Sequence, residues 1–288
     1  MDARRTSDDS APGVDATGAA LAAAARALAA VSATPQLDAE VLLAFATGKT
    51  RSSLLAFPER VLEPASSQRF AAGIARRAGG EPLAYVTGER EFFSLPLGVS
   101  PEVLIPRAET ELLVELTLAV IEELARPAVL DVGTGSGAIA LAVKRTRPDA
   151  QVTASDASAA ALGVARANAA RLALDVRFVE SRWFAAFGAQ VFDVIVSNPP
   201  YVRSAEVTGA LAREPRLALD GGPDGLDAYR QLLADAGRHL TPTGALLLEH
   251  GYDQRTALRD VATAAGWRVV AMHDDLEARP RVLQLARN

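Results

Sequence analysis

The sequence predicts an α/β protein with a Rossmann-like, seven-stranded and mostly parallel sheet, preceded by a small helical domain and a β-hairpin linker. From residue 128 onward, short apolar segments alternate with segments of helix length, which is typical of a doubly wound sheet. A glycine-rich loop follows the first of these apolar segments. The segment 191–197 is almost continuously apolar and β-branched, which indicates a strand that is buried on both faces.

Composition excludes several functional classes. The 288 residues carry a net charge of -5, so broad non-specific binding to nucleic acid is not expected. There is no cysteine, and the three histidines lack paired ligand spacing, so we expect neither disulfides nor a metal site. No segment has the pattern of an export signal, and no uninterrupted apolar run reaches about 18 residues. The sequence therefore predicts a cytoplasmic protein without a membrane span.

The chain before residue 101 is predicted to contain three parts. Residues 1–17 are polar, small and acidic, which indicates a disordered tail. Residues 18–82 form the predicted helical domain, in which Gly48 is placed as a helix C-cap. Its expected helices cover 19–31, 36–48 and 64–78. Residues 83–100 alternate in polarity and break at Thr87-Gly88 and Leu95-Pro96, which predicts the β-hairpin linker.

Residues 101–288 form the predicted catalytic domain, which begins with a long amphipathic helix over 109–124. Its expected strands are 128–132, 151–155, 175–179, 191–197, 243–249, 267–272 and 281–286. The last two are separated by only about eight residues, which favours antiparallel pairing. A parallel sheet whose final strand reverses is similar to the class I methyltransferase fold and unlike the fold of a dehydrogenase.

The loop after the first predicted strand is a candidate cofactor site. It consists of Gly133, Thr134, Gly135, Ser136 and Gly137. Glycines allow a tight turn and a close approach to a ligand, and the helix that follows offers free N–H groups to an anionic moiety. Asp156 lies about twenty residues further on, at the end of the second strand, where its carboxylate suits the two hydroxyls of a ribose. A glycine-rich loop followed by such a carboxylate fits either NAD or S-adenosylmethionine as cofactor.

Three features favour S-adenosylmethionine. Asp131 precedes the first glycine by two residues, the glycines follow the order G-x-G-x-G, and the fourth strand ends without an obvious hydride acceptor site. Trp183 follows the third strand, where an aromatic ring either covers an adenine or belongs to the core, and its position favours neither interpretation.

The fourth predicted strand ends in Asn198-Pro199-Pro200-Tyr201, at the sheet edge where α/β proteins bind ligands. Because proline fixes φ and has no N–H, the carbonyls of Asn198 and Pro199 are free to face a ligand. Asn198 adds a side-chain acceptor, and Tyr201 adds an aromatic face. Two acceptors and a stacking surface suit a planar NH2 group on a π-system. We therefore expect Asn198, Pro199 and Tyr201 to be catalytic and the whole tetrapeptide to bind substrate.

The nitrogen of such a planar NH2 group is a poor nucleophile, because its lone pair is delocalised, and no histidine or carboxylate is an obvious base. We hypothesise that the Asn198 side-chain oxygen and the Pro199 carbonyl accept the two N–H groups and orient the nitrogen toward a methyl donor. Glu249 and His250 either line the same cleft or form an ordinary strand end, and we favour the strand end. Glu109 and Glu111 either orient the cofactor or begin a helix, where carboxylates are favoured.

Together these residues resemble the N5-glutamine methyltransferases of peptide-chain release factors, the PrmC/HemK family. The resemblance covers all but about the first 35 residues and extends beyond the cofactor loop and the tetrapeptide. Its other motifs are residues 76–77, 80–85, 88, 91–92, the segment VLIPRAETE at 103–111, 214–215, 218–219, 221–222, 224–226 and 246–251. The segments at 80–85 and 103–111 make it specific, because the general fold does not require them.

The resemblance implies an enzyme that methylates the glutamine of the Gly-Gly-Gln loop in release factors, with the helical domain helping to hold the release factor. It implies S-adenosylmethionine as methyl donor and S-adenosylhomocysteine as product. The implied cofactor contacts are Gly133 to Gly137, Asp156, Trp183 and Asn198, and the implied glutamine contacts are Asn198, Pro199, Pro200 and Tyr201. The chain shows no self-complementary patch, so we expect a monomer.

Two other functions remain open at this point. The tetrapeptide would also serve an enzyme that methylates the exocyclic amine of adenine in DNA or RNA, but the acidic chain lacks a basic extension. A protein that binds S-adenosylmethionine without catalysis is the second alternative, and the intact tetrapeptide disfavours it.

Overall fold

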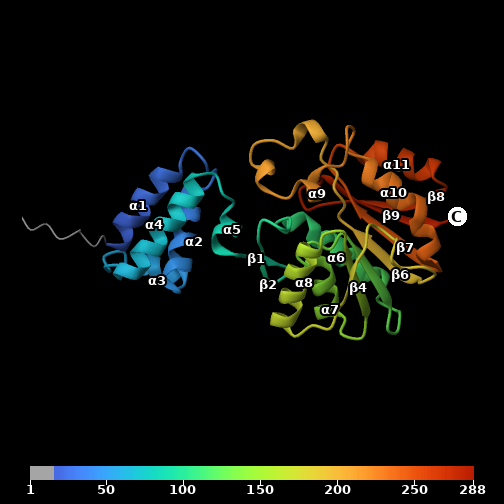
Figure 1. Ribbon diagram of the computed structural model, residues 1–288, viewed down its shortest axis with the longest axis horizontal. Helices are drawn as coiled ribbons and strands as arrows, with labels where there is room; N and C mark the ends of the chain where they lie inside the picture. The colour runs from blue at the N-terminus through green and yellow to red at the C-terminus, as the bar shows by residue number, and fades with distance from the viewer. Residues whose placement is uncertain (1–15) are drawn as a thin grey trace, which may run out of the picture. The chain divides into compact units, whose positions relative to one another are not determined.

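A computed structural model describes residues 16–288, and the chain falls into two compact units that divide between Thr87 and Gly88 (Figure 1). The predicted tail of residues 1–17 therefore lies mostly outside the described residues. Its last two residues are ordered, which corrects that boundary. Ala16 pairs with Val61, and Thr17 begins the first helix with its N–H on the Arg60 carbonyl at 2.8 Å.

The first unit is helical, as predicted. Its helices are α1 (Thr17–Leu28), α2 (Pro35–Thr47), α3 (Arg51–Ala56), α4 (Pro64–Ala78) and α5 (Leu83–Thr87). The predicted cap is confirmed, because Gly48 has a φ of 68° and its N–H bonds the Ala44 carbonyl. The sequence analysis missed α3, a short helix whose N-cap Thr50 accepts a hydrogen bond from the Ser53 N–H.

The predicted linker over 83–100 is wrong in its first part. Residues 83–87 form α5, whose Tyr85 and Val86 N–H groups both bond the Pro82 carbonyl. Tyr85 and Val86 are 5% and 4% exposed, and Val86 joins the core of the helical unit. Burial of these side chains outweighs the β-branched character that suggested a strand.

The hairpin itself exists, as β1 (Glu89–Phe92) and β2 (Leu95–Gly98), and it belongs to the second unit. Its turn is Phe93-Ser94, both with positive φ, rather than the predicted break at Leu95-Pro96. A two-residue turn with positive φ matches the twist of the paired strands. The Glu111 carboxylate accepts the Phe93 N–H at 2.8 Å and holds this turn in place.

The second unit contains the predicted sheet (Figure 1), whose seven strands lie in the order β5-β4-β3-β6-β7-β9-β8. The strands are β3 (Ala128–Val132), β4 (Gln151–Asp156), β5 (Arg177–Glu180), β6 (Phe192–Ser197), β7 (Leu240–Glu249), β8 (Trp267–Asp274) and β9 (Pro280–Arg287). Strands β3 to β7 are parallel, whereas β9 runs antiparallel to both β7 and β8. The predicted reversal at the end of the sheet is confirmed.

Helices cover both faces of this sheet. They are α6 (Glu111–Val120), α7 (Ala138–Thr146), α8 (Ala159–Leu172), α9 (Arg216–Leu219), α10 (Asp227–Asp235) and α11 (Arg255–Ala264), with short 3-10 turns at Ala108–Thr110, Ser204–Glu206, Leu211–Arg213 and Ala236–His239. Successive residues of β3 pack into the hydrophobic cores on opposite faces of the sheet. Val129 packs on the face covered by α6 and α7, and Leu130 packs on the face covered by α10 and α11. Burial on both faces explains why the strands are continuously apolar.

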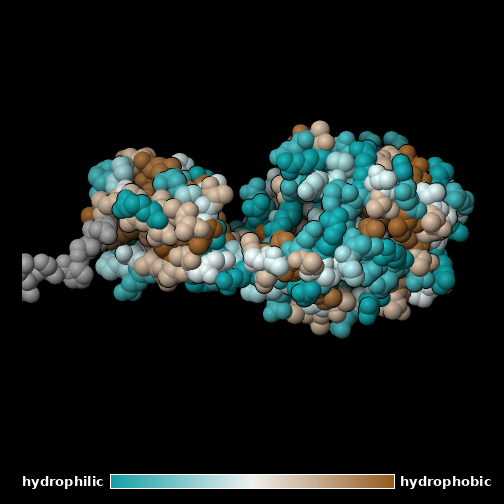
Figure 2. All heavy atoms as spheres, turned by 90° about the horizontal axis from the view of Figure 1, so that it is seen from above, coloured by the Kyte–Doolittle hydropathy of each residue, from teal (hydrophilic) through white to brown (hydrophobic). Residues whose placement is uncertain are grey.

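Apolar side chains are also exposed, and several lie on the helical unit, whose surface shows brown hydrophobic areas in Figure 2. Leu37 and Phe45 are 40% and 56% exposed, and Val41, half-buried, lies between them at four-residue spacing on α2. The face of α2 that packs inward carries Ala39, Leu42 and Leu43 instead. No helix within residues 16–288 is both long and apolar enough to traverse a bilayer.

Candidate active site

The two sequence motifs meet at one edge of the sheet. Strands β3 and β6 are parallel neighbours in register Asp131↔Val196, so the loop after β3 begins beside the tetrapeptide after β6. Strand β4 flanks β3 on the other side in register Val132↔Ser155, which places Asp156 beside Gly133. In a parallel sheet this carboxyl edge is where ligands bind.

The glycine-rich loop is shaped by backbone conformations that favour glycine. Gly133, Gly135 and Gly137 have φ values of 76°, 56° and 86°. The N–H groups of Gly133 and Thr134 both bond the Ser155 carbonyl, at 2.8 and 2.9 Å. A side chain at Gly133 or Gly135 would meet no atom within 4 Å, so both residues border open space. The loop therefore leaves room for a ligand directly against its backbone.

The Asp131 side chain holds the loop and the start of α7 through hydrogen bonds. It is fully buried, and its Oδ2 accepts the Thr134 hydroxyl at 2.6 Å and the Ala140 N–H at 3.2 Å. Among the described residues, nothing bonds its Oδ1. Burial raises the pKa of Asp131 to about 7, although both of those hydrogen bonds lower it.

Asp156 ties the end of β4 to the loop. Its Oδ2 accepts the Gly135 N–H and its Oδ1 accepts the Ser158 N–H, each at 2.9 Å. A carboxylate oxygen has two acceptor sites, so each oxygen retains one for a ligand hydroxyl. The bond between Asp156 and Gly135 thus joins two parts of the predicted cofactor site, in which Thr134 and Ser136 are buried, at 6% and 2% exposed.

Asn198 is held in one orientation by a residue far away in the sequence. Its Nδ2 donates to the Thr110 hydroxyl at 3.2 Å, which turns its Oδ1 away from Thr110. Among the described residues, no hydrogen bond is donated to the Pro199 carbonyl. The tetrapeptide therefore has two acceptors, Asn198 Oδ1 and the Pro199 carbonyl, to which no group of residues 16–288 donates a hydrogen bond.

Tyr201 lies beside a buried carboxyl. Its hydroxyl donates to Glu249 Oε1 at 3.4 Å, and Glu249, the last residue of β7, is 1% exposed. Burial raises the pKa of Glu249 to about 7, while the nearby Thr110 hydroxyl and the charge of Arg281 lower it. Burial likewise raises the pKa of the Tyr201 hydroxyl, so the phenol stays protonated.

A second loop supports the backbone of the tetrapeptide. Gly221 donates its N–H to the Val202 carbonyl at 2.8 Å, and the Gln254 side chain bonds the carbonyls of Tyr201 and Gly225 at 3.0 and 3.2 Å. A Cβ at Gly221 would lie 2.7 Å from the Pro200 carbonyl oxygen, and one at Gly225 would lie 2.4 Å from that of Tyr201. Only glycine fits at either position.

Comparison with known families agrees with this geometry. Residues 19–88 match the family described as PrmC N-terminal domain, and residues 108–217 match the methyltransferase small domain. A release factor glutamine methyltransferase of Burkholderia pseudomallei is 48% identical over 256 residues, which cover 85% of this chain and 90% of that protein. Those of Moorella thermoacetica and Salmonella typhimurium are 48% and 45% identical, over 81% and 87% of this chain and 84% and 92% of theirs. The chain belongs to the release factor glutamine methyltransferase family.

Solved structures share the fold of this family member at low sequence identity. A methyltransferase of Pyrococcus furiosus is 21% identical, with a TM-score of 0.50, over 75% of this chain and 96% of that one. The hMettl16 catalytic domain in complex with MAT2A 3'UTR hairpin 6 is 15% identical, with a TM-score of 0.56, over 75% and 82%. The fold is the class I methyltransferase fold.

Trp183 is only half-buried in this family member and follows β5 with a φ of 51°. Its Nε1 donates to Gln231 Oε1 at 2.6 Å, and its ring packs against the core on the α10 side. One part of the ring is therefore core, and contact with an adenine stays a prediction.

Several residues that shape the site were not singled out from the sequence. They are Thr110, Asn168, Gln254 and, as a neighbour of Tyr201, Glu249. Asn168 is 3% exposed, and it bonds the Ser136 carbonyl of the loop as well as both backbone groups of Gly98 in the hairpin. Gln254 also accepts the N–H of nearby Gly251, but the bonds that these side chains make to the tetrapeptide and the loops around it span at least 29 residues, so no local pattern reveals them. The sequence offers one signal, which is a polar residue within an otherwise apolar helix face, as at Asn168.

The 103–111 segment that distinguishes this family is anchored to Glu214. Glu214 accepts the Ile105 N–H at 3.0 Å and forms an ion pair with Arg107. The Glu214 side chain is 6% exposed and that of Arg107 is 34% exposed, so only the carboxylate is well shielded from water. This contact links the segment 103–111, which carries Thr110, to the loop region after the tetrapeptide, which carries Glu214.

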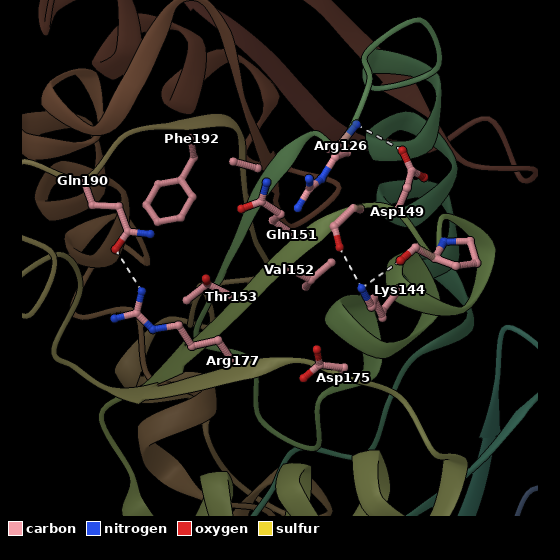
Figure 3. A pocket seen from close by; sticks show the side chains of 13 residues that line it. Arg126, Lys144, Asp149, Gln151, Val152, Thr153, Asp175, Arg177, Gln190 and Phe192 are labelled. Atoms are coloured by element: carbon pink, nitrogen blue, oxygen red, sulfur yellow. Dashed lines mark hydrogen bonds between the residues drawn. The ribbon is translucent and has the colours of Figure 1, made fainter.

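A cavity of about 480 Å³ lies at the opposite edge of the sheet, where β3, β4, β5 and β6 begin (Figure 3). Two of its basic side chains already bond protein atoms, because Lys144 donates to two carbonyls and Arg177 donates to Gln190. Within residues 16–288, Arg126 donates only its backbone N–H in this region, to the Asp149 carboxylate. Neither sequence motif reaches this cavity. Among the described residues, no cluster of three or more His, Asp or Glu side chains is arranged to hold a metal ion.

Proposed function

We propose that this protein transfers a methyl group from S-adenosylmethionine to the side-chain amide nitrogen of the glutamine in the Gly-Gly-Gln motif of peptide-chain release factors. The observation that carries the proposal is the tetrapeptide Asn198 to Tyr201, which lies at the end of β6 beside the glycine-rich loop. Relatives that are 41–48% identical to this protein are named release factor glutamine methyltransferase.

The residues at the loop fit S-adenosylmethionine. The open space over Gly133 and Gly135 accommodates an extended ligand, and Asp156 keeps acceptor sites for ribose hydroxyls. Asp131 Oδ1, a buried acceptor without a partner among the described residues, suits the positively charged end of the ligand. When bound, S-adenosylmethionine supplies a methyl group activated by a sulfonium.

The tetrapeptide would act by orienting the substrate amide. Asn198 Oδ1 and the Pro199 carbonyl accept the two N–H groups, and the Tyr201 ring stacks on the amide plane. Such positioning contributes several kcal/mol to lowering the barrier, up to roughly 7–11 kcal/mol in the best intramolecular cases. Tyr201 also offers the face of its ring to a cation, which contributes about 0.5–2 kcal/mol. Water accepts the proton that the nitrogen loses.

Replacing Asp156 with alanine is expected to raise the Kd for S-adenosylmethionine roughly ten- to hundredfold, because hydrogen bonds to a charged group contribute about 1.5–3 kcal/mol. Isothermal titration calorimetry measures this Kd directly. The matched control is Asp175→Ala, which removes the same charge at the opposite edge of the sheet. Equal affinities in the two variants would argue against ribose binding by Asp156.

The helical unit, residues 18–82 in the sequence prediction, is proposed to bind the release factor. The exposed stripe of Leu37, Val41 and Phe45 on α2 supports this proposal, because an apolar stripe is unfavourable in water unless a partner covers it. We further propose that the protein acts as a monomer in the cytoplasm, without nucleic acid or a membrane as partner.

Phe45→Asp is therefore expected to raise KM for the release factor about tenfold, because a charge would be buried in an apolar contact, while kcat changes little. Steady-state kinetics with purified release factor gives both constants. Leu276→Asp is the control, since Leu276 is fully exposed in the turn between β8 and β9. If both variants gave the same KM, the stripe on α2 would not be the docking surface.

Methylation of adenine remains the second candidate, since the same acceptors suit its exocyclic amine. One structural neighbour is bound to a 3'UTR hairpin, but a likeness at 15% identity extends to the fold alone. The deciding experiment incubates the protein with labelled S-adenosylmethionine and either release factor, duplex DNA or RNA. Label on the glutamine of the Gly-Gly-Gln motif, located by mass spectrometry, supports the proposal. Label on nucleic acid only, or on nothing, overturns it.

A further inference from the structure

Asn168 is a buried amide on α8, the helix that packs against the hairpin strand β2 (Figure 1). It is 3% exposed, and its neighbours on the buried face of the helix, Ala165 and Ala169, are apolar. Asparagine has a lower helix propensity than alanine, and a buried amide is unfavourable unless its hydrogen bonds are made. The methylation mechanism above does not use this side chain, so its presence depends on the partners that it binds.

The hairpin determines which way the Asn168 amide faces. Its Oδ1 accepts the Gly98 N–H at 2.7 Å, and its Nδ2 donates to the Gly98 carbonyl at 3.0 Å. A flipped amide would place its NH2 group against the Gly98 N–H and its oxygen against the Gly98 carbonyl, so like groups would face each other. A Cβ at Gly98 would lie 3.0 Å from Asn168 Oδ1, so the pair also depends on glycine there. These two bonds leave one Nδ2 hydrogen for a third partner.

The remaining hydrogen binds the glycine-rich loop. Its acceptor is the Ser136 carbonyl, 2.9 Å from Asn168 Nδ2. The Gly137 N–H on the same peptide group bonds the Thr134 carbonyl, also at 2.9 Å, so this peptide is held on both sides. Close packing of α8 on the loop brings the amide within reach, because a Cβ at Gly137 would lie only 3.3 Å from that of Ala165, about one turn before Asn168.

The peptide group that Asn168 holds adjoins the part of the loop that borders open space. Gly135, with a φ of 56°, lies directly before it, and a side chain there would meet no atom within 4 Å. The Ser136 N–H bonds no acceptor within residues 16–288, so it is available to a ligand. A loop that already has its bound conformation binds more tightly, because it need not be ordered when the ligand arrives.

We propose that Asn168 is a positioning residue for S-adenosylmethionine, which uses the hairpin backbone at Gly98 as its support and holds the Ser136 carbonyl so that the loop keeps its cofactor-binding conformation. The residue does not touch the cofactor and acts through the loop. The role rests on the proposed use of S-adenosylmethionine and deepens it. It makes the hairpin, which contributes none of the predicted cofactor residues, a determinant of cofactor affinity.

The test measures the Kd for S-adenosylmethionine by calorimetry in the full-length protein, in Asn168→Ala, in Gly98→Ala, in the double variant and in Arg171→Ala. Arg171 is the matched control, because it follows Asn168 by about one turn of α8 and ties the same hairpin to the helix. It donates to the Glu89 carboxylate and to the Pro96 carbonyl, and among the described residues it has no bond to the loop. Thermal unfolding shows whether each variant is folded at the temperature of the titration.

Asn168→Ala is expected to raise this Kd about tenfold, because the loop then has to be ordered by the ligand, whereas kcat at saturating S-adenosylmethionine should stay within about threefold of wild type. Gly98→Ala keeps the amide but displaces its oxygen, and it should raise the Kd about threefold. The double variant should bind no more weakly than Asn168→Ala, because outside Asn168 the nearest atom to a Cβ at Gly98 is 4.0 Å away. Arg171→Ala should leave the Kd within about twofold of wild type.

A wild-type Kd in Asn168→Ala overturns the positioning role, and so does an equal rise in Arg171→Ala, since general loosening of the hairpin would then be the cause. Additive effects in the double variant overturn it too. If Asn168→Ala does not fold, Gly98→Ala decides, and an unchanged Kd in that variant overturns the role. If the wild-type protein binds no S-adenosylmethionine, this role and the proposed function both fail. If it binds S-adenosylmethionine but methylates no release factor, only the proposed function fails, and the same Kd values still decide the role of Asn168.

Discussion

Replacing Asn198 with alanine is expected to lower kcat for release-factor methylation about a hundredfold or more, because removal of one well-placed hydrogen-bonding group commonly costs that much. The variant loses the acceptor that fixes one N–H of the substrate and the donor that Thr110 receives at 3.2 Å. The nitrogen would then sample orientations in which it does not face the methyl donor. Single-turnover kinetics with saturating S-adenosylmethionine measures the step directly.

Two further variants make this result specific. Gln190→Ala removes an amide side chain near the other end of β6, at the cavity of the opposite edge, and should leave kcat unchanged. Asn198→Asp keeps the acceptor but replaces the Nδ2 donor with an oxygen that faces the Thr110 hydroxyl. It should be slower than the wild type, because it brings a negative charge into a half-buried position. Near wild-type kcat in Asn198→Ala would refute the acceptor role.

The sheet and the ligand edge could be predicted because they are encoded locally. The segment predicted as a strand over 191–197 is β6, Phe192–Ser197, and the two prolines that end it need no partner to fix their backbone. The same holds for the loop at 133–137, where glycine is placed at three positive φ values. Residues whose own chemistry determines their conformation were predicted correctly.

Two other features depend on partners that the local sequence does not reveal. Residues 83–87 have β-branched and aromatic character, yet they are helical, and Val86 is buried in the core of the helical unit. The Thr110 hydroxyl meets Asn198 across 88 residues, and the Tyr201 hydroxyl meets Glu249 across 48. Glu249 therefore looked like an ordinary strand end. The motifs could be located from sequence, whereas the contacts that orient their side chains required the fold.

The tetrapeptide also depends on Gly225, and Gly225→Ala is expected to impair both stability and activity. The residue has a φ of 76°, and a Cβ there would lie 2.4 Å from the Tyr201 carbonyl oxygen and 2.6 Å from Gln254 Nε2. Positive φ and overpacking together should lower the unfolding free energy by about 2–4 kcal/mol. Because the clash falls on the backbone of Tyr201, kcat of the folded variant should also drop about a hundredfold. Denaturant unfolding and kinetics below the transition measure the two effects separately.

Gly266→Ala separates backbone strain from the clash. Gly266 has a φ of 83°, close to that of Gly225, but a Cβ there meets no atom within 4 Å. It should lose only about 1 kcal/mol of unfolding free energy, with kcat unchanged. A Gly225→Ala enzyme that loses no more stability than Gly266→Ala and keeps its kcat would show that the support from residues 221–225 does not control the tetrapeptide. A loss confined to Gly225→Ala would instead identify the Tyr201 carbonyl and its Gln254 bond as the support that holds the tetrapeptide in its active conformation.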